Sequence, residues 1–238
     1  MGARRPSLTS TLLTLRLVKL ARELELRLER LVEGLSATLF RGRLHPVDLA
    51  NRLVRFVDLS VTDGDTGPEI GNRYVVRVHP SDLDSSIDLK ALNSELAAAV
   101  REIAAQHGWR IGGPIAVSVA PDLGIGSGGV TCTATADPGP IHPWSQLIEP
   151  SGAAVHDIGD NRVRVGRASD ADVRIAHSRV SRHHALIYRE GQVVTIVDLD
   201  SANGTSVNGN SLPAGGAEIG PGDLIAVGPA TFSFRLLM

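Results

Sequence analysis

The second half of this 238-residue chain alternates apolar and polar residues in short runs, and turn-forming residues interrupt the runs every few positions. Alternation with a period of two places one face of a strand in a core and the other face in solvent. Runs of this kind, separated by Gly, Asn, Asp or Pro, are typical of a β-sandwich. They cover residues 162–165, 172–175, 185–188, 193–197, 224–227 and 231–235. The pattern predicts an all-β sandwich over residues 153–238.

The first half of the chain mixes helical and strand-like patterns. Leucines recur every three or four positions between about residues 12 and 40, which predicts an amphipathic helix. A second helix is expected to begin at Pro46 and run to about Val57, and an Ala-rich third helix is expected over residues 89–107, ended by a glycine. Strands are predicted at residues 73–79, 115–119 and 130–136, with a polar loop at 62–68. The chain is therefore expected to be multidomain, with a small α+β domain over residues 12–137.

The two predicted domains are separated by a proline-rich stretch. Four prolines fall within residues 138–152. Proline restricts the backbone, so a linker of this composition is stiff rather than freely flexible. We therefore expect residues 138–152 to be a short linker.

Composition narrows the classes of function. Apolar content of 42% and charged content of 21% are ordinary for a soluble globular protein. A net charge of −2 argues against a general DNA binder, although residues 1–60 hold 11 Lys or Arg against 6 Asp or Glu. The single cysteine, Cys132, excludes an internal disulfide and favours a reducing cytoplasm. No apolar run approaches the roughly 20 residues of a membrane span, so we expect a cytoplasmic protein.

Cationic and polar residues gather between the predicted strands of the sandwich. They form the groups Gly166-Arg167, Ser181-Arg182-His183-His184, Asn203-Gly204 and Asn208-Gly209. Residues that lie between strands can converge in space. An arginine fork suits two phosphate oxygens, a serine adds a hydroxyl, and an asparagine can donate to and accept from a peptide backbone. Each residue alone is an ordinary loop residue, but together they predict a site that binds one phosphate and the peptide carrying it.

In this order and spacing the four groups make residues 153–237 resemble a forkhead-associated (FHA) domain. That family is a β-sandwich whose loops bind phosphothreonine peptides without catalysis. The resemblance implies that Arg167 and Ser181 contact the phosphate, that Arg182 assists, and that Asn203 holds the peptide backbone. It assigns structural support of the loops to three further residues, Gly166, His184 and Gly204.

The N-terminal half resembles the α+β module of unknown function that precedes the FHA domain in an actinobacterial family. The resemblance rests on Leu28-x-x-Leu31-Val32-Glu33-Gly34, residues 45–50 and residues 74–78. That family is associated with serine/threonine-kinase signalling around cell-wall synthesis and division. The resemblance implies that a Ser/Thr kinase or its substrates are the phosphothreonine partners.

Two threonines suggest a target within the chain itself. Thr62 and Thr66 lie in the predicted polar loop, and each has an acidic residue three positions later, Asp65 and Glu69. FHA domains commonly read the third residue after the phosphothreonine. We expect Arg179, close to the serine of the site, to select that acid. The hypothesis is that a kinase phosphorylates this loop and that the sandwich of a second copy binds it.

Other motifs give weaker evidence for function. Residues 124–129 match G-x-G-x-x-G, but a predicted strand follows instead of the helix that dinucleotide binding requires. Ser181 has histidines nearby but lies outside any G-x-S-x-G elbow, which argues against a hydrolase. No convincing set of metal ligands is present. We therefore expect no enzyme activity, no cofactor and no metal.

The sequence favours a non-enzymatic signalling adaptor that binds phosphothreonine. Two alternatives stay open. The first is a phosphorylation-independent scaffold that dimerises through the leucine-rich helix. The second is RNA or anionic-lipid binding by the basic N-terminal region. The oligomeric state and the identity of the partner are also left open.

Overall fold

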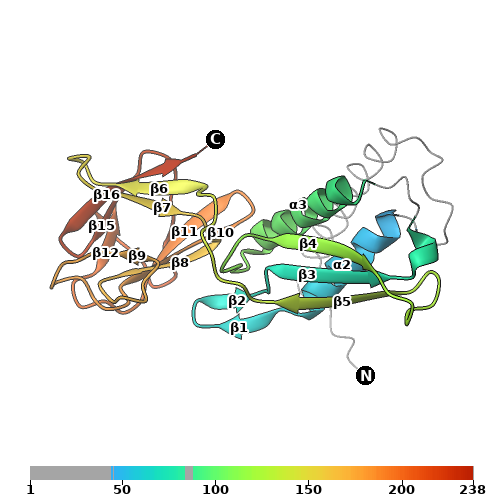
Figure 1. The fold of residues 1–238 in the computed structure, drawn as a ribbon. Helices are drawn as coiled ribbons and strands as arrows, with labels where there is room; N and C mark the ends of the chain where they lie inside the picture. The colour runs from blue at the N-terminus through green and yellow to red at the C-terminus, as the bar shows by residue number, and fades with distance from the viewer. Residues whose placement is uncertain (1–43, 45, 84–87, 238) are drawn as a thin grey trace, which may run out of the picture. The chain divides into compact units, whose positions relative to one another are not determined.

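A computed structural model describes residue 44 and residues 46–83 and 88–237. The leucine-rich helix expected near residues 12–40 lies outside the described residues. The described residues belong to two compact units that alternate along the chain (Figure 1). One unit contains the residues up to Leu59 together with Tyr74–Ile103 and Ala116–Ala134. The other contains Ser60–Arg73, Ala104–Ile115 and the chain from Thr135 onward. Among the described residues, no helix is long and apolar enough to cross a membrane.

The first unit is a small α+β assembly, the class that the sequence predicted for residues 12–137, but residues 60–73 and 104–115 of that predicted domain belong to the other unit. The sheet of the first unit has the order β4-β3-β5, and two helices and a short 3-10 helix accompany it in the part of the unit that the structure describes. The bounds are α2 Pro46–Leu59, β3 Arg73–Val78, η1 Pro80–Asp82, α3 Leu89–His107, β4 Ala116–Pro121 and β5 Val130–Thr135. The central strand β3 buries every second residue, which fits its alternating sequence. The helix α3 begins and ends where the Ala-rich pattern and the following glycine placed it.

The glycine-rich segment between β4 and β5 is a supported turn. Asp82, which is 2% exposed, accepts hydrogen bonds from the Ser127 hydroxyl at 2.8 Å and from the Gly128 N–H at 2.6 Å. The segment leads into β5 and not into a helix. The G-x-G-x-x-G match therefore lacks the strand-to-helix setting of a dinucleotide site.

The second unit is built on a β-sandwich. One sheet has the order β14-β11-β10-β8-β9 and the other β13-β12-β15-β16-β6-β7. Their bounds are β6 Ser145–Ile148, β7 Val155–Ile158, β8 Arg162–Gly166, β9 Val173–Arg174, β10 Ala185–Glu190, β11 Val193–Asp198, β12 Thr205–Val207, β13 Asn210–Ser211, β14 Ala217–Glu218, β15 Leu224–Val227 and β16 Ala230–Leu236. The β8 and β9 strands pair in parallel, and the other pairs of these two sheets are antiparallel. This architecture confirms the predicted fold class.

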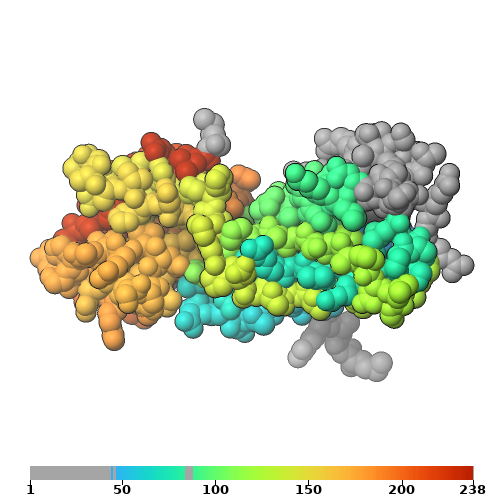
Figure 2. Space-filling view, in the orientation of Figure 1, coloured from blue at the N-terminus to red at the C-terminus, as the bar shows by residue number. Residues whose placement is uncertain are grey.

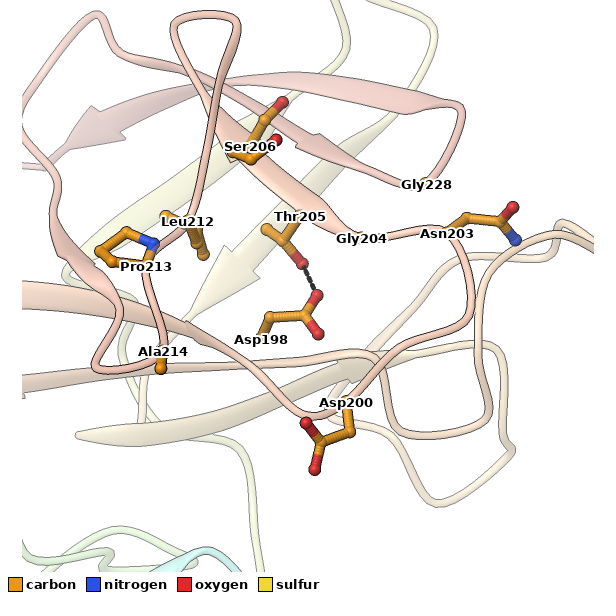
Figure 3. A pocket seen from close by; sticks show the side chains of 11 residues that line it. Asp198, Asp200, Asn203, Gly204, Thr205, Ser206, Leu212, Pro213, Ala214 and Gly228 are labelled. Atoms are coloured by element: carbon orange, nitrogen blue, oxygen red, sulfur yellow. Dashed lines mark hydrogen bonds between the residues drawn. The ribbon is translucent and has the colours of Figure 1, made fainter.

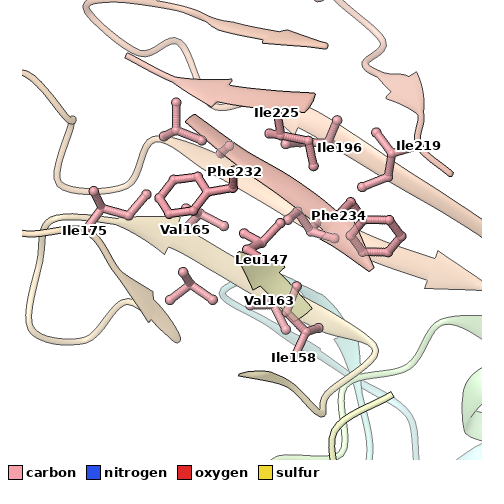
Figure 4. Packing of buried hydrophobic residues seen from close by; sticks show 14 of the residues in the cluster. Leu147, Ile158, Val163, Val165, Ile175, Ile196, Ile219, Ile225, Phe232 and Phe234 are labelled. Carbon is pink, nitrogen blue, oxygen red and sulfur yellow. The ribbon is translucent and has the colours of Figure 1, made fainter. Parts of the chain in front are cut away.

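Apolar side chains from both sheets fill the space between them. Val165 and Ile196 from one sheet, and Ile225, Phe232 and Phe234 from the other, are at most 1% exposed. Figure 4 shows these side chains pointing toward one another across the sandwich. In the space-filling view the yellow-to-red segments of the sandwich form one closely packed body (Figure 2). The core gives the connecting loops a rigid base.

The sandwich begins earlier than the sequence suggested. Residues 138–152 were expected to form a linker, but Ser145–Ile148 form β6, which pairs with both β16 and β7. Trp144 packs edge-on against Phe234 at 6.4 Å and donates its indole N–H to the Asp160 carbonyl. Prolines at 143 and 150 lie on either side of β6, and this proline content favoured the linker prediction. Residues 145–148 of the predicted linker therefore belong to the sandwich.

Residues 62–68, expected to be a polar loop, form a β-hairpin. The strands β1 Thr62–Gly64 and β2 Gly67–Glu69 are antiparallel, with Thr62 opposite Glu69. Gly67 has a φ of 114°, which side-chain-bearing residues rarely adopt. The hairpin sequence has no apolar alternation, so the period-two criterion could not detect it.

Candidate functional site

Three loops of the sandwich meet around Ser181. Arg167 begins the loop that follows β8, and its N–H donates to the Ser181 carbonyl at 3.0 Å. The Ala168 N–H donates to the Arg182 carbonyl at 3.2 Å. The loop between β11 and β12 joins them, because the Ala202 N–H donates to the Ser181 hydroxyl at 3.1 Å. The structure therefore brings together the loops on which Arg167, Ser181, Arg182 and Asn203 lie.

Gly166 lets two of these loops approach each other closely. A Cβ atom at this position would lie 2.0 Å from the Arg182 carbonyl oxygen and 2.8 Å from its carbonyl carbon. Both are backbone atoms that a rotamer change cannot move away. Only glycine permits this approach, which keeps the start of the Arg167 loop against Arg182.

His184 connects the Ser181 loop to the loop that contains Gly204. Its side chain is 0% exposed, and its Nδ1 accepts the Ser181 N–H at 3.0 Å. Nε2 therefore carries the proton in the neutral ring and donates to the Gly204 carbonyl at 3.0 Å. The same carbonyl also accepts the Gly228 N–H at 3.0 Å. The His184 ring thus binds the backbone N–H of Ser181 and not the Ser181 hydroxyl, so the two residues do not form a nucleophile–base pair.

Asp198 organises the loop between β11 and β12. Its carboxylate accepts hydrogen bonds from the N–H and the hydroxyl of Ser201, each at 2.8 Å, and from the Thr205 hydroxyl at 2.5 Å. Burial raises the pKa of Asp198, but the bonds from Thr205 and Ser201 outweigh it and the pKa is lowered. The Ser201 hydroxyl in turn accepts the Gly204 N–H at 3.0 Å. Sequence reasoning missed these supports, although the D-x-x-S spacing is a signal for side-chain-to-backbone bonding.

The ligand-facing candidates differ in exposure from their supports. Arg167, Arg182 and Asn203 are exposed, and Ser181 is half-buried. Asn203 donates one side-chain N–H to the Arg179 carbonyl at 2.7 Å, which fixes the backbone next to the exposed Arg179 side chain. Arg167, Arg179 and Arg182 are all exposed and lie on two loops that contact each other. Their positive charges give this region the electrostatic character of an anion site.

A cavity of about 420 Å³ lies beside Asn203 (Figure 3). The β11–β12 loop and the segment after β13 line it. Its lining residues are Asp198, Asp200, Asn203, Gly204, Thr205, Ser206, Ser211, Leu212, Pro213, Ala214 and Gly228. The cavity gives the site a polar recess next to the phosphate-binding candidates.

The second Asn-Gly pair forms a turn and is not among the residues that meet around Ser181. Asn208 has a φ of 51°, donates to the Asp223 carboxylate at 2.8 Å and accepts the Leu224 N–H at 2.9 Å. Hydrogen bonds from the Gly220 N–H and from Asn208 lower the pKa of Asp223. Asn208 and Asp223 therefore hold neighbouring turns of the sandwich together.

The two threonines proposed as phosphoacceptors have different environments. Thr62 is exposed on β1. Thr66 is 8% exposed, and its carbonyl accepts an N–H of Arg162 at 3.2 Å. Its buried hydroxyl oxygen has no hydrogen-bond partner among the residues that the structure describes. A kinase could reach the hydroxyl of Thr66 only after the hairpin opened.

Within the described ranges, no group of three or more His, Cys, Asp and Glu is placed to hold a metal ion. The exposed His183 lies 3.1 Å from the Asp170 carboxylate and lowers its pKa. This pair lies at the surface, outside the buried His184 network.

Two family models match the chain. The FHA domain matches residues 163–228, and the N-terminal domain of FhaA matches residues 21–133. Among curated proteins, the chain is 34% identical over 91 residues to the FHA domain-containing protein FhaA of Mycobacterium tuberculosis, covering 38% of this chain and 17% of that protein. It is 33% identical over 92 residues to the transcriptional regulatory protein EmbR of Mycobacterium bovis, covering 35% and 24%. The chain thus spans less than a quarter of the length of these relatives.

Solved FHA domains are also similar to the chain. A structure from work on phosphothreonine-dependent FHA domain interactions is 29% identical, covers 40% of this chain and 97% of its own, and has a TM-score of 0.37. The FhaA FHA domain complexed with the intracellular domain of Rv3910 is 28% identical, covers 38% and 98%, and has a TM-score of 0.35.

Proposed function

We propose that this chain, which joins an FhaA N-terminal domain to an FHA domain and is homologous to mycobacterial FhaA, is a non-enzymatic signalling adaptor that binds phosphothreonine segments of other proteins. The observation that carries the proposal is the meeting of three loops around Ser181, with Arg167 and Arg182 exposed beside it. Arg167 and Ser181 would bind the phosphate, Arg182 would assist, and Asn203 would hold the peptide backbone.

The expected affinity follows from the charge of the ligand. A phosphothreonine carries about −1.5 to −2 charges at neutral pH. Three or four charge-assisted hydrogen bonds of about 1.5–3 kcal/mol each are offset by the ordering of a flexible peptide. The remainder corresponds to a Kd near about 1 μM, or about −8 kcal/mol. An adaptor of this affinity releases its partner once the phosphate is removed.

The N-terminal match supports a particular signalling context. Residues 21–133 match the FhaA N-terminal domain, and this module resembles that of actinobacterial proteins associated with Ser/Thr-kinase signalling. The proposed partners are a Ser/Thr kinase or its substrates, acting in the cytoplasm in control of cell-wall synthesis or division.

Arg179 would set the sequence preference of the site. Its backbone carbonyl is held by Asn203, and a Cβ atom on Gly228 would lie 3.0 Å from that carbonyl oxygen. The Arg179 side chain is exposed next to the loops of the site. A fixed backbone with an exposed cationic side chain suits the selection of an acidic residue on the bound peptide.

Thr62 is a candidate target for the site of a second copy. It is exposed, and the acidic residue three positions later, Asp65, is exposed as well. Thr66 is the weaker candidate because its hydroxyl is buried. The scaffold and the RNA or lipid alternatives rest on segments that lie mostly outside the described residues.

A peptide array probed with the full chain tests the proposal. Each peptide is present with threonine, phosphothreonine and phosphoserine, and peptides spanning residues 58–70 carry phosphate at Thr62 or Thr66. We expect micromolar binding to phosphothreonine peptides with Asp or Glu at the third following position, and binding at least about 100-fold weaker without phosphate. Equal binding with and without phosphate would contradict the adaptor proposal and favour a scaffold. If other phosphothreonine peptides bind but the Thr62 peptide gains nothing from its phosphate, only the second-copy target is wrong.

A further inference from the structure

Arg110 forms a bidentate ion pair with Asp172, which lies on the loop that carries Arg167. Arg110 lies in Ala104–Ile115, a segment of the same compact unit as the sandwich. Its guanidinium donates to the two carboxylate oxygens of Asp172 at 2.6 and 3.1 Å, and also to the Arg162 carbonyl at 2.6 Å. The two side chains are 24% and 26% exposed. A bidentate arginine–carboxylate pair of this kind is geometrically specific and is less screened than a fully exposed pair.

Hydrogen bonds of the backbone hold residues 110–112 in place independently of the Arg110 side chain. The Arg110 N–H donates to the Pro68 carbonyl at 2.9 Å, and its carbonyl accepts the Ile70 N–H at 3.0 Å. The next two N–H groups, of Ile111 and Gly112, donate to the carboxylate of Asp160 at 2.9 and 2.8 Å. Arg110 is therefore held between the end of the hairpin, at Pro68 and Ile70, and the turn before β8.

Asp172 ends the loop that Arg167 begins. The loop covers residues 167–172 and connects the parallel strands β8 and β9. Asp172 also accepts the Arg164 N–H at 2.8 Å, so one carboxylate joins β8, the loop and Arg110. At its other end the loop is held by the bond from the Arg167 N–H to Ser181. Without Arg110, Asp172 would lose two charged hydrogen bonds at this end of the loop. Its carboxylate would then carry an unpaired negative charge in the loop that is proposed to bind a phosphate.

We infer that Arg110 is a positioning residue for the phosphate site: it fixes the Arg167 loop through Asp172, so full phosphothreonine affinity requires residues 104–115 as well as the sandwich. The inference rests on the proposed phosphothreonine binding. Residues 104–115 thereby contribute to phosphopeptide recognition, although they lie outside residues 163–228, the region that matches the FHA domain.

A double-mutant cycle in the full chain tests this inference. Arg110→Ala and Asp172→Asn are each expected to weaken binding of a phosphothreonine peptide from the array by roughly 5- to 10-fold, and the double variant should be no weaker than the weaker single variant. Arg110→Lys should give an intermediate loss, because it keeps the charge but not the fork. The control is Arg73→Ala, which removes another Arg–Asp pair of the same unit, Arg73–Asp137 at 2.7 Å, and should change affinity by less than about 2-fold.

Thermal melts confirm that each variant is folded at the titration temperature. If Arg110→Ala does not fold, the Arg110→Lys and Asp172→Asn variants carry the test. Wild-type affinity in the folded Arg110 variants, or losses that simply add in the double variant, would overturn the inference while leaving phosphothreonine binding intact. Failure of the wild-type chain to bind any phosphothreonine peptide would instead contradict the proposed function.

Discussion

Replacing Arg167 with alanine is expected to weaken phosphothreonine-peptide binding by at least about 100-fold, because two charge-assisted hydrogen bonds of about 1.5–3 kcal/mol each are lost. The fold should survive, since the Arg167 side chain is exposed and its contribution to the loop is a backbone N–H that alanine keeps. Calorimetric titration with the tightest array peptide measures the loss of affinity. The melting temperature should change by no more than about 2 °C.

The matched control for Arg167 is Arg235. Arg235 is an exposed arginine on β16 of the other sheet, and its guanidinium contacts the Gln146 side chain. Arg235→Ala should lower affinity by less than about 2-fold, because it changes the overall charge but not the site. Unchanged binding in Arg167→Ala would contradict the assignment of this residue to the phosphate. Equal losses in both variants would indicate a general charge effect instead of a specific contact.

Replacing His184 with alanine is expected to lower the free energy of unfolding by about 2–4 kcal/mol. The imidazole is fully buried, so its removal creates a cavity. The Ser181 N–H would also lose its acceptor, while the Gly204 carbonyl would keep only its bond from Gly228. Since His184 links two of the three loops, phosphopeptide affinity should fall as well. Urea denaturation measures the stability, and titration well below the unfolding midpoint measures the affinity.

The neighbouring histidine provides the control for His184. His183 is exposed and pairs with the exposed Asp170 at the surface. His183→Ala should therefore leave the unfolding midpoint close to that of the wild type. Comparable destabilisation by the two substitutions would show that the buried His184 network does not hold the loops together.

Strong local periodicity made much of the fold predictable. The Ala-rich run with a following glycine gave α3 its bounds, Leu89–His107, and alternating residues located β15 and β16 to within a residue. The Gly166-Arg167 pair, the Ser181–His184 group and the Asn203-Gly204 pair lie on loops that the structure brings together around Ser181. In these segments the local sequence and the tertiary structure favour the same conformation.

The remaining features depend on contacts that leave little local trace. The strands β1 and β2 are three residues long and show no apolar alternation, and β6 lies in a proline-rich stretch whose composition predicted a linker. Asp198 supports the site through a D-x-x-S turn that does not resemble a binding motif. Arg110 lies 62 positions before Asp172, so nothing in its own neighbourhood indicates that pairing. Pairs that are this far apart in the sequence can be identified only from the three-dimensional structure.

The central claim is that three loops of the sandwich form a phosphothreonine site, and an NMR titration of the isotope-labelled full chain tests it most directly. On addition of the tightest phosphothreonine peptide, the largest amide shifts should occur at Gly166–Ala168, Arg179–Arg182 and Ala202–Gly204, together with the side-chain Nε–H of Arg167. The unphosphorylated peptide should leave these signals in place. Shifts that concentrate outside these loops, or that are the same with and without the phosphate, would contradict the proposed site.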